Sequence, residues 1–302
     1  MHVVWTLATR LLMVAYSVGS GIIVARWLGA EGLGVYAVLG VTINNAVQMG
    51  GSGLTAANIY FTSQNRRILK PVAVNALIFA LAGGGVIAFG ITGLASHEPT
   101  LFRSIPLKLV AIAAAAIPFQ MIILFGLNVF LTLGLVKHFN LLEALGQSFI
   151  LLNAVLALVI WGAGLLTLIP LNTAACVAVS VLISWMVYRH LAQQKGESLW
   201  RPDASLFGRM LRYGIKFNAS MTATMLVFRA DVLIVNYFRG TTEAGIYSVA
   251  SQGGLLLMLL PNVIGTLLFP RVASMRDERG EFTSLVTRHT AFVMALVCLA
   301  AA

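Results

Sequence analysis

Three charged side chains, those of Arg10, Arg229 and Asp231, lie inside long apolar stretches of the sequence. A charge in hydrocarbon is costly, so such residues usually face a partner, a water-filled cavity or a ligand. Arginine stays charged and binds phosphate through two hydrogen bonds at once, which makes Arg10 and Arg229 candidates for binding a diphosphate. The structural alternative is that either arginine only pairs with Asp231. For Asp231 the choice lies between a salt-bridge partner and an ion-coupling site.

Two amide side chains, Asn44 and Gln48, are four residues apart in a second apolar stretch and share one face of a helix. They are candidates for binding sugar hydroxyls, although tying helices together is the commoner role of such residues. The sequence has no P-loop, zinc motif or nucleophile elbow, and its two cysteines, Cys176 and Cys298, lie in apolar runs. We therefore predict no enzyme activity, no cofactor and no metal site.

The elements that must position these residues are membrane-spanning helices. Of the 302 residues 59% are hydrophobic and only 10% are charged, with a mean hydropathy of +0.90. Apolar runs of 20 residues or more are long enough to cross hydrocarbon. We predict an all-α polytopic membrane protein with eight full spans, near residues 3–26, 34–60, 71–95, 107–133, 142–167, 170–191, 212–238 and 244–269. Part of a ninth begins near Ala291.

The distribution of Lys and Arg predicts the orientation of these spans. One set of alternate loops carries 13 basic residues and the other carries 4. The positive-inside rule then places the N-terminus and the more basic loops in the cytoplasm. The formal net charge of +10 is accordingly explained largely by topology, and nucleic acid is not an expected partner.

An internal repeat links the first and seventh spans. The segment IVARWLGAEGLGVYAV (23–38) aligns at an offset of 211 residues with IVNYFRGTTEAGIYSV (234–249), with six of 16 positions identical. An even number of spans separates the copies, so the repeat is parallel and predicts two lobes around an axis along the membrane normal. Six spans form the first lobe and fewer than three belong to the second, so we expect the chain to be truncated.

The predicted division of the chain follows from this repeat. Residues 1–191 form a six-helix N-terminal lobe, and residues 212–302 begin a truncated C-terminal lobe. Residues 192–211 are predicted to form a cytoplasmic linker in the headgroup layer, with Leu206, Phe207 and Met210 on one face. Pro118 and Pro261 are expected to kink their spans. The glycine runs 50–53 and 83–85 indicate close helix packing.

The segments ARWLGAEGLGVYAVL, LRYGIKFNASMTATMLVFRADVLIVNYFRGTTEAGIYSVASQ and LLFPRVASM resemble the Wzx-type polysaccharide flippases of the multidrug/oligosaccharidyl-lipid/polysaccharide exporter superfamily. The resemblance implies two six-helix lobes in the bacterial inner membrane. It also implies that the protein flips undecaprenyl-diphosphate-linked oligosaccharide outward by alternating access, among membrane lipids, with coupling to H⁺ or Na⁺ left open.

Two alternatives to oligosaccharide flipping remain. Within the same superfamily, the substrate is lipid II or a drug, although two intramembrane arginines favour an anionic substrate. From another class, the protein is a membrane glycan polymerase, ligase or acyltransferase. An enzyme of that kind needs a large extracytoplasmic catalytic loop, and the longest predicted one, near residues 96–106, is short.

Overall fold

The structure is a computed structural model that describes residues 2–102, 105–193, 199–257, 287–288 and 291. The chain forms two compact units, residues 1–246 and 247–302, and the description below concerns the first. The described residues form helices joined by short connections, as the all-α prediction requires. The helices are α1 (His2–Gln64), α2 (Leu69–His97), α3 (Leu107–Ala114), α4 (Ile117–Thr132), α5 (Val136–Ala154), α6 (Leu165–Ala192), α7 (Ala204–Arg239) and α8 (Thr241–Leu257), with single turns at Arg66–Ile68, Pro99–Phe102 and Val155–Ile160.

Among the described residues, five helical stretches are long and apolar enough to cross a membrane. They are residues 8–64, 66–97, 107–132, 136–160 and 165–192. They account for the first six predicted spans, because the first stretch contains two of them. Predicted span seven corresponds to α7, and α8 begins the eighth. The remainder of predicted span eight, the ninth span and Pro261 lie outside the described residues, so the total of eight spans stays a prediction.

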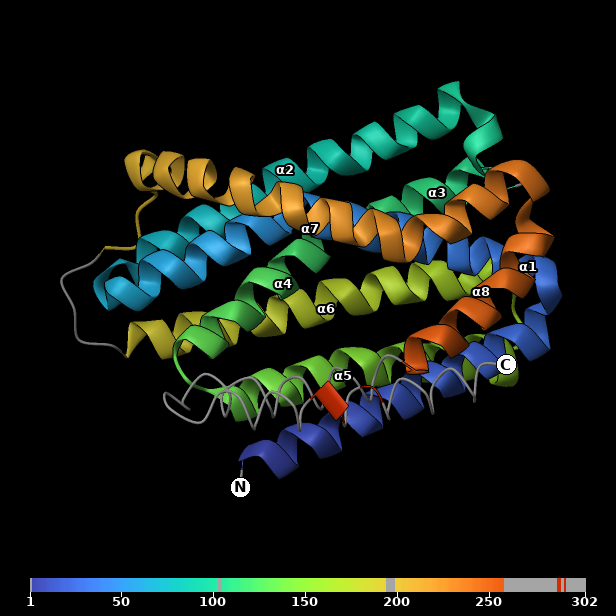
Figure 1. Cartoon of the computed structure of the whole chain (residues 1–302), viewed down its shortest axis with the longest axis horizontal. Coiled ribbons are helices and arrows are strands. Elements are labelled where there is room, and N and C mark those ends of the chain that lie inside the picture. Colours follow the sequence, from blue (N-terminus) through green and yellow to red (C-terminus); the bar gives the residue numbers. More distant parts are fainter. Residues whose placement is uncertain (1, 103–104, 194–198, 258–286, 289–290, 292–302) are drawn as a thin grey trace. The chain divides into compact units, whose positions relative to one another are not determined.

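Both copies of the repeat reverse the chain at an equivalent glycine. Gly29 divides α1 into two helical halves, with φ 66° and ψ −173°. Gly240 ends α7 with φ 93° and ψ 177°. Side chains other than hydrogen are essentially excluded from this region of backbone space, so both turns require glycine. Figure 1 shows that the first half of α1 and α7 run in the same direction, as the parallel repeat predicts.

The second glycine that the two copies share, Gly34 in one and Gly245 in the other, lies at the junction between the copies. A Cβ atom on Gly34 would collide with the backbone of Thr241, and one on Gly245 would collide with the backbone of Ala30. Ala30 and Thr241 are themselves equivalent positions of the repeat, so each copy presents the same two positions to the other. Such reciprocity is the mark of a two-fold relation. In the described residues, α1 and α7 form the most extensive helix pair.

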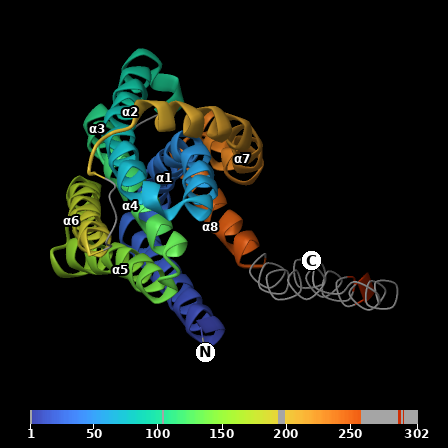
Figure 2. The same ribbon diagram turned by 90° about the vertical axis from the view of Figure 1, so that its left-hand side faces the viewer.

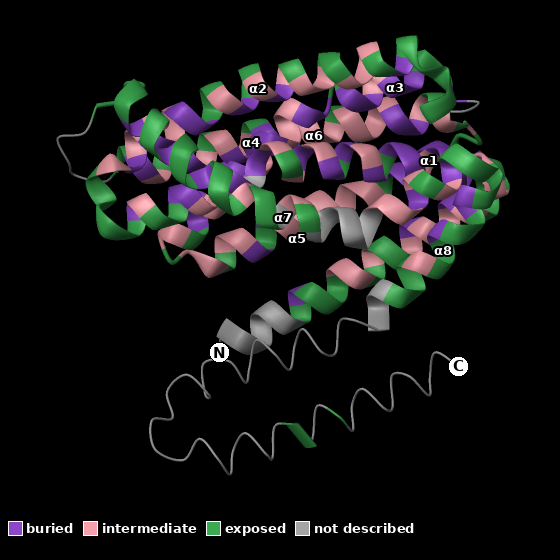
Figure 3. Ribbon diagram, turned by 45° about the horizontal axis from the view of Figure 1, so that its top comes forward, coloured by how far each residue is buried: buried purple, intermediate pink, exposed green. Residues whose placement is uncertain are grey.

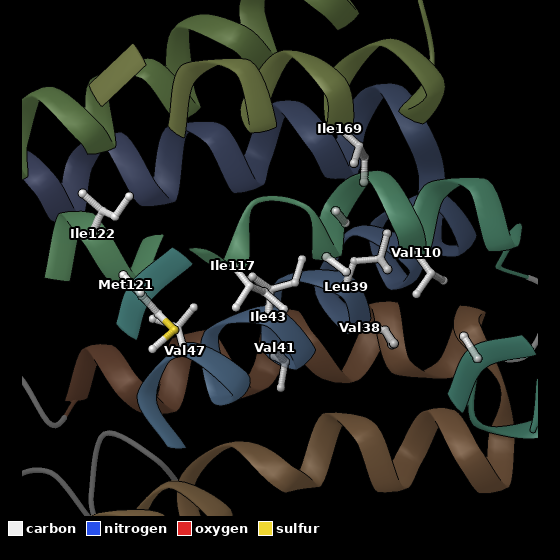
Figure 4. Close-up of a cluster of buried hydrophobic side chains, with 14 of the residues drawn as sticks. Val38, Leu39, Val41, Ile43, Val47, Val110, Ile117, Met121, Ile122 and Ile169 are labelled. Atoms are coloured by element: carbon white, nitrogen blue, oxygen red, sulfur yellow. The ribbon is translucent and has the colours of Figure 1, made fainter. Parts of the chain in front are cut away.

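The buried core lies where these helices face one another. Viewed along the bundle, α6 and α7 lie on opposite sides of α1 and α4 (Figure 2). Buried residues occupy the facing sides of the helices, and exposed residues occupy the outward sides (Figure 3). Figure 4 shows the centre of this core, where side chains of α1, α3, α4 and α6 meet: Val38, Leu39, Val41, Ile43, Val47, Val110, Ile117, Met121, Ile122 and Ile169. Burial of such side chains is a major favourable term in packing.

Glycine and proline shape the packing around this core. The predicted fourth span is interrupted between α3 and α4, directly before Pro118, which confirms the expected kink. A Cβ atom on Gly84 would lie 2.6 Å from Pro118 Cα, and one on Gly51 would lie 2.9 Å from a Leu124 methyl carbon. Both glycine runs therefore permit close helix approach, as predicted.

The start of α7 corrects one boundary of the sequence analysis. Helix α7 begins at Ala204, inside the segment predicted to be an interfacial linker. Leu206 and Met210 are buried against other helices of the first unit, whereas their depth in the membrane stays a prediction. Asp203 caps the helix, because its carboxylate accepts hydrogen bonds from the Leu206 backbone N–H (2.9 Å) and from the Ser205 hydroxyl (2.8 Å). These hydrogen bonds lower the pKa of the Asp203 carboxyl.

Asn75 of α2 fixes the same segment from the other side. Its Nδ2 donates a hydrogen bond to the Asp203 carbonyl oxygen (2.9 Å), and its Oδ1 accepts one from the Asp203 backbone N–H (3.2 Å). Asn75 is itself buried. A single side-chain amide of the third span thus satisfies both backbone groups of the residue that precedes α7.

Candidate functional site

A cavity of about 430 Å³ lies in the first unit, between α1, α4, α5 and α6. Its wall combines aliphatic side chains with nine side chains that carry a polar or ionisable group. They are Tyr36 and Asn44 from α1, Gln120 from α4, Glu143, Gln147 and Asn153 from α5, and Asn172, Thr173 and Cys176 from α6. Polar groups in a membrane bundle are costly unless they are paired or meet a ligand, so this cavity is the candidate site.

One end of the cavity is held by a chain of hydrogen bonds among neutral groups. Asn153 Nδ2 donates to Asn172 Oδ1 (2.9 Å), and Asn172 Nδ2 in turn contacts the Tyr36 hydroxyl (3.5 Å). The Thr173 hydroxyl donates to the carbonyl oxygen of Ile112 (3.1 Å). This chain joins α5, α6 and the second half of α1, and so fixes the positions of three walls.

The middle of the cavity has weaker polar contacts. Gln120 Nε2 lies 3.9 Å from the Cys176 sulfur, which is a poor acceptor. Asn44 is exposed on α1 and lines the same space. These amides leave hydrogen-bonding capacity toward the interior.

The other end of the cavity carries an ion pair. Arg10 Nη1 lies 2.9 Å from Glu143 Oε1, and the Arg10 and Glu143 side chains are 45% and 24% exposed. The guanidinium also lies 6.0 Å from the centroid of the Phe139 ring. The second carboxylate oxygen, Oε2, is buried and makes no hydrogen bond to the described residues. One carboxylate oxygen of Glu143 is thus paired with Arg10, and the other accepts no hydrogen bond from the described residues.

The structure brings together some of the predicted site residues. Asn44 lines the cavity, and Arg10 reaches it through Glu143. Gln48 lies one turn further along α1 and is not part of the described cavity wall. Asp231 lies on α7, where its Oδ1 accepts a hydrogen bond from the Val232 backbone N–H (2.8 Å). Arg229 also lies on α7, but its side chain is outside the described residues.

Glu143 was missed in the sequence because the start of its span was misplaced. Predicted span five begins at residue 142, which puts Glu143 at the membrane boundary, where a carboxylate needs no explanation. In the structure α5 begins at Val136, so Glu143 lies two turns inside the helix. It is also the only acidic residue between Glu98 and Glu197, a signal that was available from the sequence.

Arranged in this way, the cavity can bind a polar, uncharged group at one end and exchange an anion at the other. Amide and hydroxyl groups both donate and accept, which suits sugar hydroxyls. The guanidinium suits a carboxylate or a phosphate. In the described part of the chain no three His, Cys, Asp or Glu side chains cluster as metal ligands.

Comparison with known proteins identifies the family. Residues 23–301 match the family described as polysaccharide biosynthesis protein. The chain belongs to this family. This polysaccharide biosynthesis protein is 27% identical over 288 residues to the succinoglycan biosynthesis transport protein ExoT of Rhizobium meliloti (strain 1021). The alignment covers 90% of this chain and 54% of that relative, so the chain spans about half the length of the curated relative that it matches.

Solved structures establish the fold of this polysaccharide biosynthesis protein. A transporter of the MOP superfamily from Pyrococcus furiosus Vc1 (DSM3638), described as having a binding pocket of reversed polarity, superposes with a TM-score of 0.65 at 14% identity, covering 86% of this chain and 60% of that one. An outward-facing multidrug resistance transporter of the MATE family superposes with a TM-score of 0.60 at 16% identity, covering 85% and 60%. The resemblance to flippases of this superfamily is thus confirmed in family and fold, and the protein is a multi-pass membrane protein.

Proposed function

We propose that this polysaccharide biosynthesis protein supplies the first lobe, and the beginning of the second, of an exporter of lipid-linked oligosaccharide. The exporter moves undecaprenyl-diphosphate-linked oligosaccharide from the cytoplasmic to the outer face of the bacterial inner membrane by alternating access, without acting as an enzyme. The family and the transport role of the succinoglycan relative support transport of a polysaccharide precursor. The observation that carries the substrate is the cavity, with amides at one end and the Arg10–Glu143 pair at the other.

In this proposal the neutral amides of the cavity wall bind sugar hydroxyls. Asn44, Gln120 and Gln147 supply donors and acceptors without charge. Binding a sugar there replaces the water that these groups otherwise need in a low-dielectric bundle. Gln48 lies one turn further along α1 on the same helix face as Asn44.

At the charged end, the diphosphate competes with Glu143 for Arg10. A phosphate oxygen forms the same charge-assisted contact with the guanidinium as the carboxylate does. Once displaced, the Glu143 carboxylate is an unpaired charge in an apolar bundle, and binding of H⁺ or Na⁺ neutralises it. Glu143 thereby links substrate binding to ion uptake. Arg229 and Asp231 supply the corresponding charges on the first helix of the second lobe.

Substitutions in the full-length protein test the role of Arg10. We expect Arg10→Ala to lower export at least about tenfold, because losing a charge-assisted contact costs about 1.5–3 kcal/mol and about 1.4 kcal/mol corresponds to one decade. Arg10→Lys should retain part of the activity. The measurement is surface polysaccharide, together with the unflipped lipid-linked pool, in a strain that lacks its own flippase.

The double variant Arg10→Ala with Glu143→Ala separates phosphate binding from a purely structural ion pair. Removing both charges leaves neither unpaired, so full export by the double variant would refute the phosphate role. Arg26→Ala is the matched control, because Arg26 lies at the opposite end of the first half of α1 and stacks on Trp27 (5.8 Å). Its export should stay within about twofold of the wild type.

The orientation of the chain is part of the proposal and has its own test. Ser63 is exposed at the C-terminal end of α1, and Ser96 is exposed at the C-terminal end of α2. The length of α2 separates these two positions. With the basic loops in the cytoplasm, an impermeant thiol reagent outside the cell should label Ser96→Cys and leave Ser63→Cys unlabelled. The reverse pattern would place the N-terminus outside.

A further inference from the structure

A second hollow lies on the opposite side of α4 from the polar cavity. It is a groove of about 640 Å³ between α2, α4 and α6, bordered at one end by Trp200 of the connection to α7. Its wall is almost entirely apolar, with Val74, Leu77, Phe125, Val181 and Trp185 among the lining residues. The hydroxyls of Ser180 and Ser184 also line it, but each donates a hydrogen bond to a carbonyl oxygen of α6 (2.8 Å).

The groove is open toward the outside of the first unit. Leu77 is 41% exposed, Val181 62% and Trp185 51%, although all three belong to helices long and apolar enough to cross a membrane. Water does not enter the hydrocarbon region. An open apolar space at this depth is therefore filled by hydrocarbon chains.

The end of the groove at the start of α2 and the end of α6 has the composition of a headgroup contact. Tyr188 packs on Trp200 with ring centroids 5.2 Å apart. The Arg189 guanidinium lies 4.8 Å from the Trp185 ring centroid. Lys70 lies one turn before Val74 on α2, and Arg201 follows Trp200 in sequence. Aromatic rings favour the level of the headgroups, and basic side chains at that level attract anionic lipid.

The volume of the groove indicates which hydrocarbon chain it holds. Its volume equals that of roughly 20 water molecules in the liquid. One fatty-acyl chain fits within such a volume, whereas an undecaprenyl tail is several times longer and would extend well beyond the groove. We propose that the groove is a binding site for an anionic phospholipid, with one acyl chain between α2, α4 and α6 and the headgroup held by Lys70, Arg189 and Arg201.

A lipid bound here would support the connection between the lobes. Trp200 lies three residues before Asp203, the residue that Asn75 holds by both backbone groups. Asn75 lies between Val74 and Ala76, which line the groove. The lipid therefore contacts the same turn of α2 and the same connecting segment that position the start of α7.

The first test fills the groove. Val74→Trp places a large side chain in the acyl site, and Val86→Trp, on the lipid-exposed face of the same helix and outside the groove, is the matched control. The measurement is native mass spectrometry of the full-length protein released from the cell membrane, with the retained phospholipids identified after extraction. We expect Val74→Trp to lose one retained anionic phospholipid per protein and Val86→Trp to keep it. Equal retention by the two variants, or a retained polyprenyl lipid, would overturn the proposal.

The second test does not depend on the tolerance of the groove for a large side chain. Lys70→Gln, Arg189→Gln and Arg201→Gln together remove the headgroup charges at partly or fully exposed positions. In nanodiscs of mixed phosphatidylglycerol and phosphatidylcholine, we expect the preference of the retained lipid for phosphatidylglycerol to fall about tenfold. Lys108→Gln, at the other end of the bundle, should leave that preference unchanged. An unchanged preference in the triple variant would refute the headgroup assignment.

Discussion

The two hollows of the first unit share helices α4 and α6 but differ in the chemistry of their walls. On one side, Gln120 of α4 and Asn172 of α6 face the polar cavity. On the other side, Phe125 of α4 and Val181 of α6 face the apolar groove. The same two helices thus separate a site for a hydrophilic headgroup from a site for hydrocarbon. A flippase needs such a separation, because the polar part of its substrate has to be shielded from the hydrocarbon of the bilayer.

The largest expected difference between the two hollows is in transport. Glu143→Gln in the cavity keeps the shape of the side chain but removes its charge, so export should fall about tenfold or more. Ser184→Ala in the groove wall removes a hydroxyl that bonds only to its own helix, so export should stay within about twofold of the wild type. Both are measured as surface polysaccharide. Equal losses in the two variants would mean that the hollows do not have separate roles.

A smaller difference is expected in stability. Asn172→Leu removes the link between Asn153 and Tyr36 and leaves polar groups of both without this partner. We expect a loss of about 1–3 kcal/mol in the free energy of unfolding in detergent. Val181→Ala on the exposed groove wall should cost less than about 0.5 kcal/mol. A cost at Asn172 no larger than that at Val181 would show that the hydrogen-bonded chain does not hold the cavity together.

The smallest effect concerns the segment at the end of the groove. Because the pKa of Asp203 is lowered from 3.8 in the folded state, its cap stabilises the start of α7 above that value and is lost as the pH falls through the folded pKa. The protection factors of amides 204–207 against hydrogen exchange should begin to fall as the pH drops below about 4 and should keep falling as it approaches the folded pKa. The protection factors of Asp203→Asn should not depend on pH in this window. A fall of equal size in Asp203→Asn would assign the change to another group.

The sequence predicted the helices and the repeat well, because both depend on local chemistry. The length of each apolar run predicts a span, and the turns at Gly29 and Gly240 use a backbone conformation that only glycine adopts readily. Helix ends were less predictable. Asp203 starts α7 through its cap, and α5 extends through Lys137, His138 and Asn140 at the membrane boundary, where hydropathy gives no signal.

The partners of the charged residues could not be predicted from the sequence. The structural alternative paired Arg10 or Arg229 with Asp231, whereas a contact across 133 residues between α1 and α5 pairs Arg10 with Glu143. The polar cavity likewise depends on how four separate helices turn their faces. Of the predicted binding residues whose side chains the structure describes, only Asn44 lies in its wall, and the roles of Arg10, Gln48, Arg229 and Asp231 stay predictions.

The reciprocal contact at Gly34 and Gly245 has the form of a homodimer interface. Each repeat offers the other the same pair of positions, as two identical subunits do across a two-fold axis. The covalent link between α6 and α7 takes no part in that contact. Two separate polypeptides, divided in the segment that joins α6 to α7, could therefore make the same contact. In the fused chain the two halves need not have the same sequence, so each half can acquire different residues.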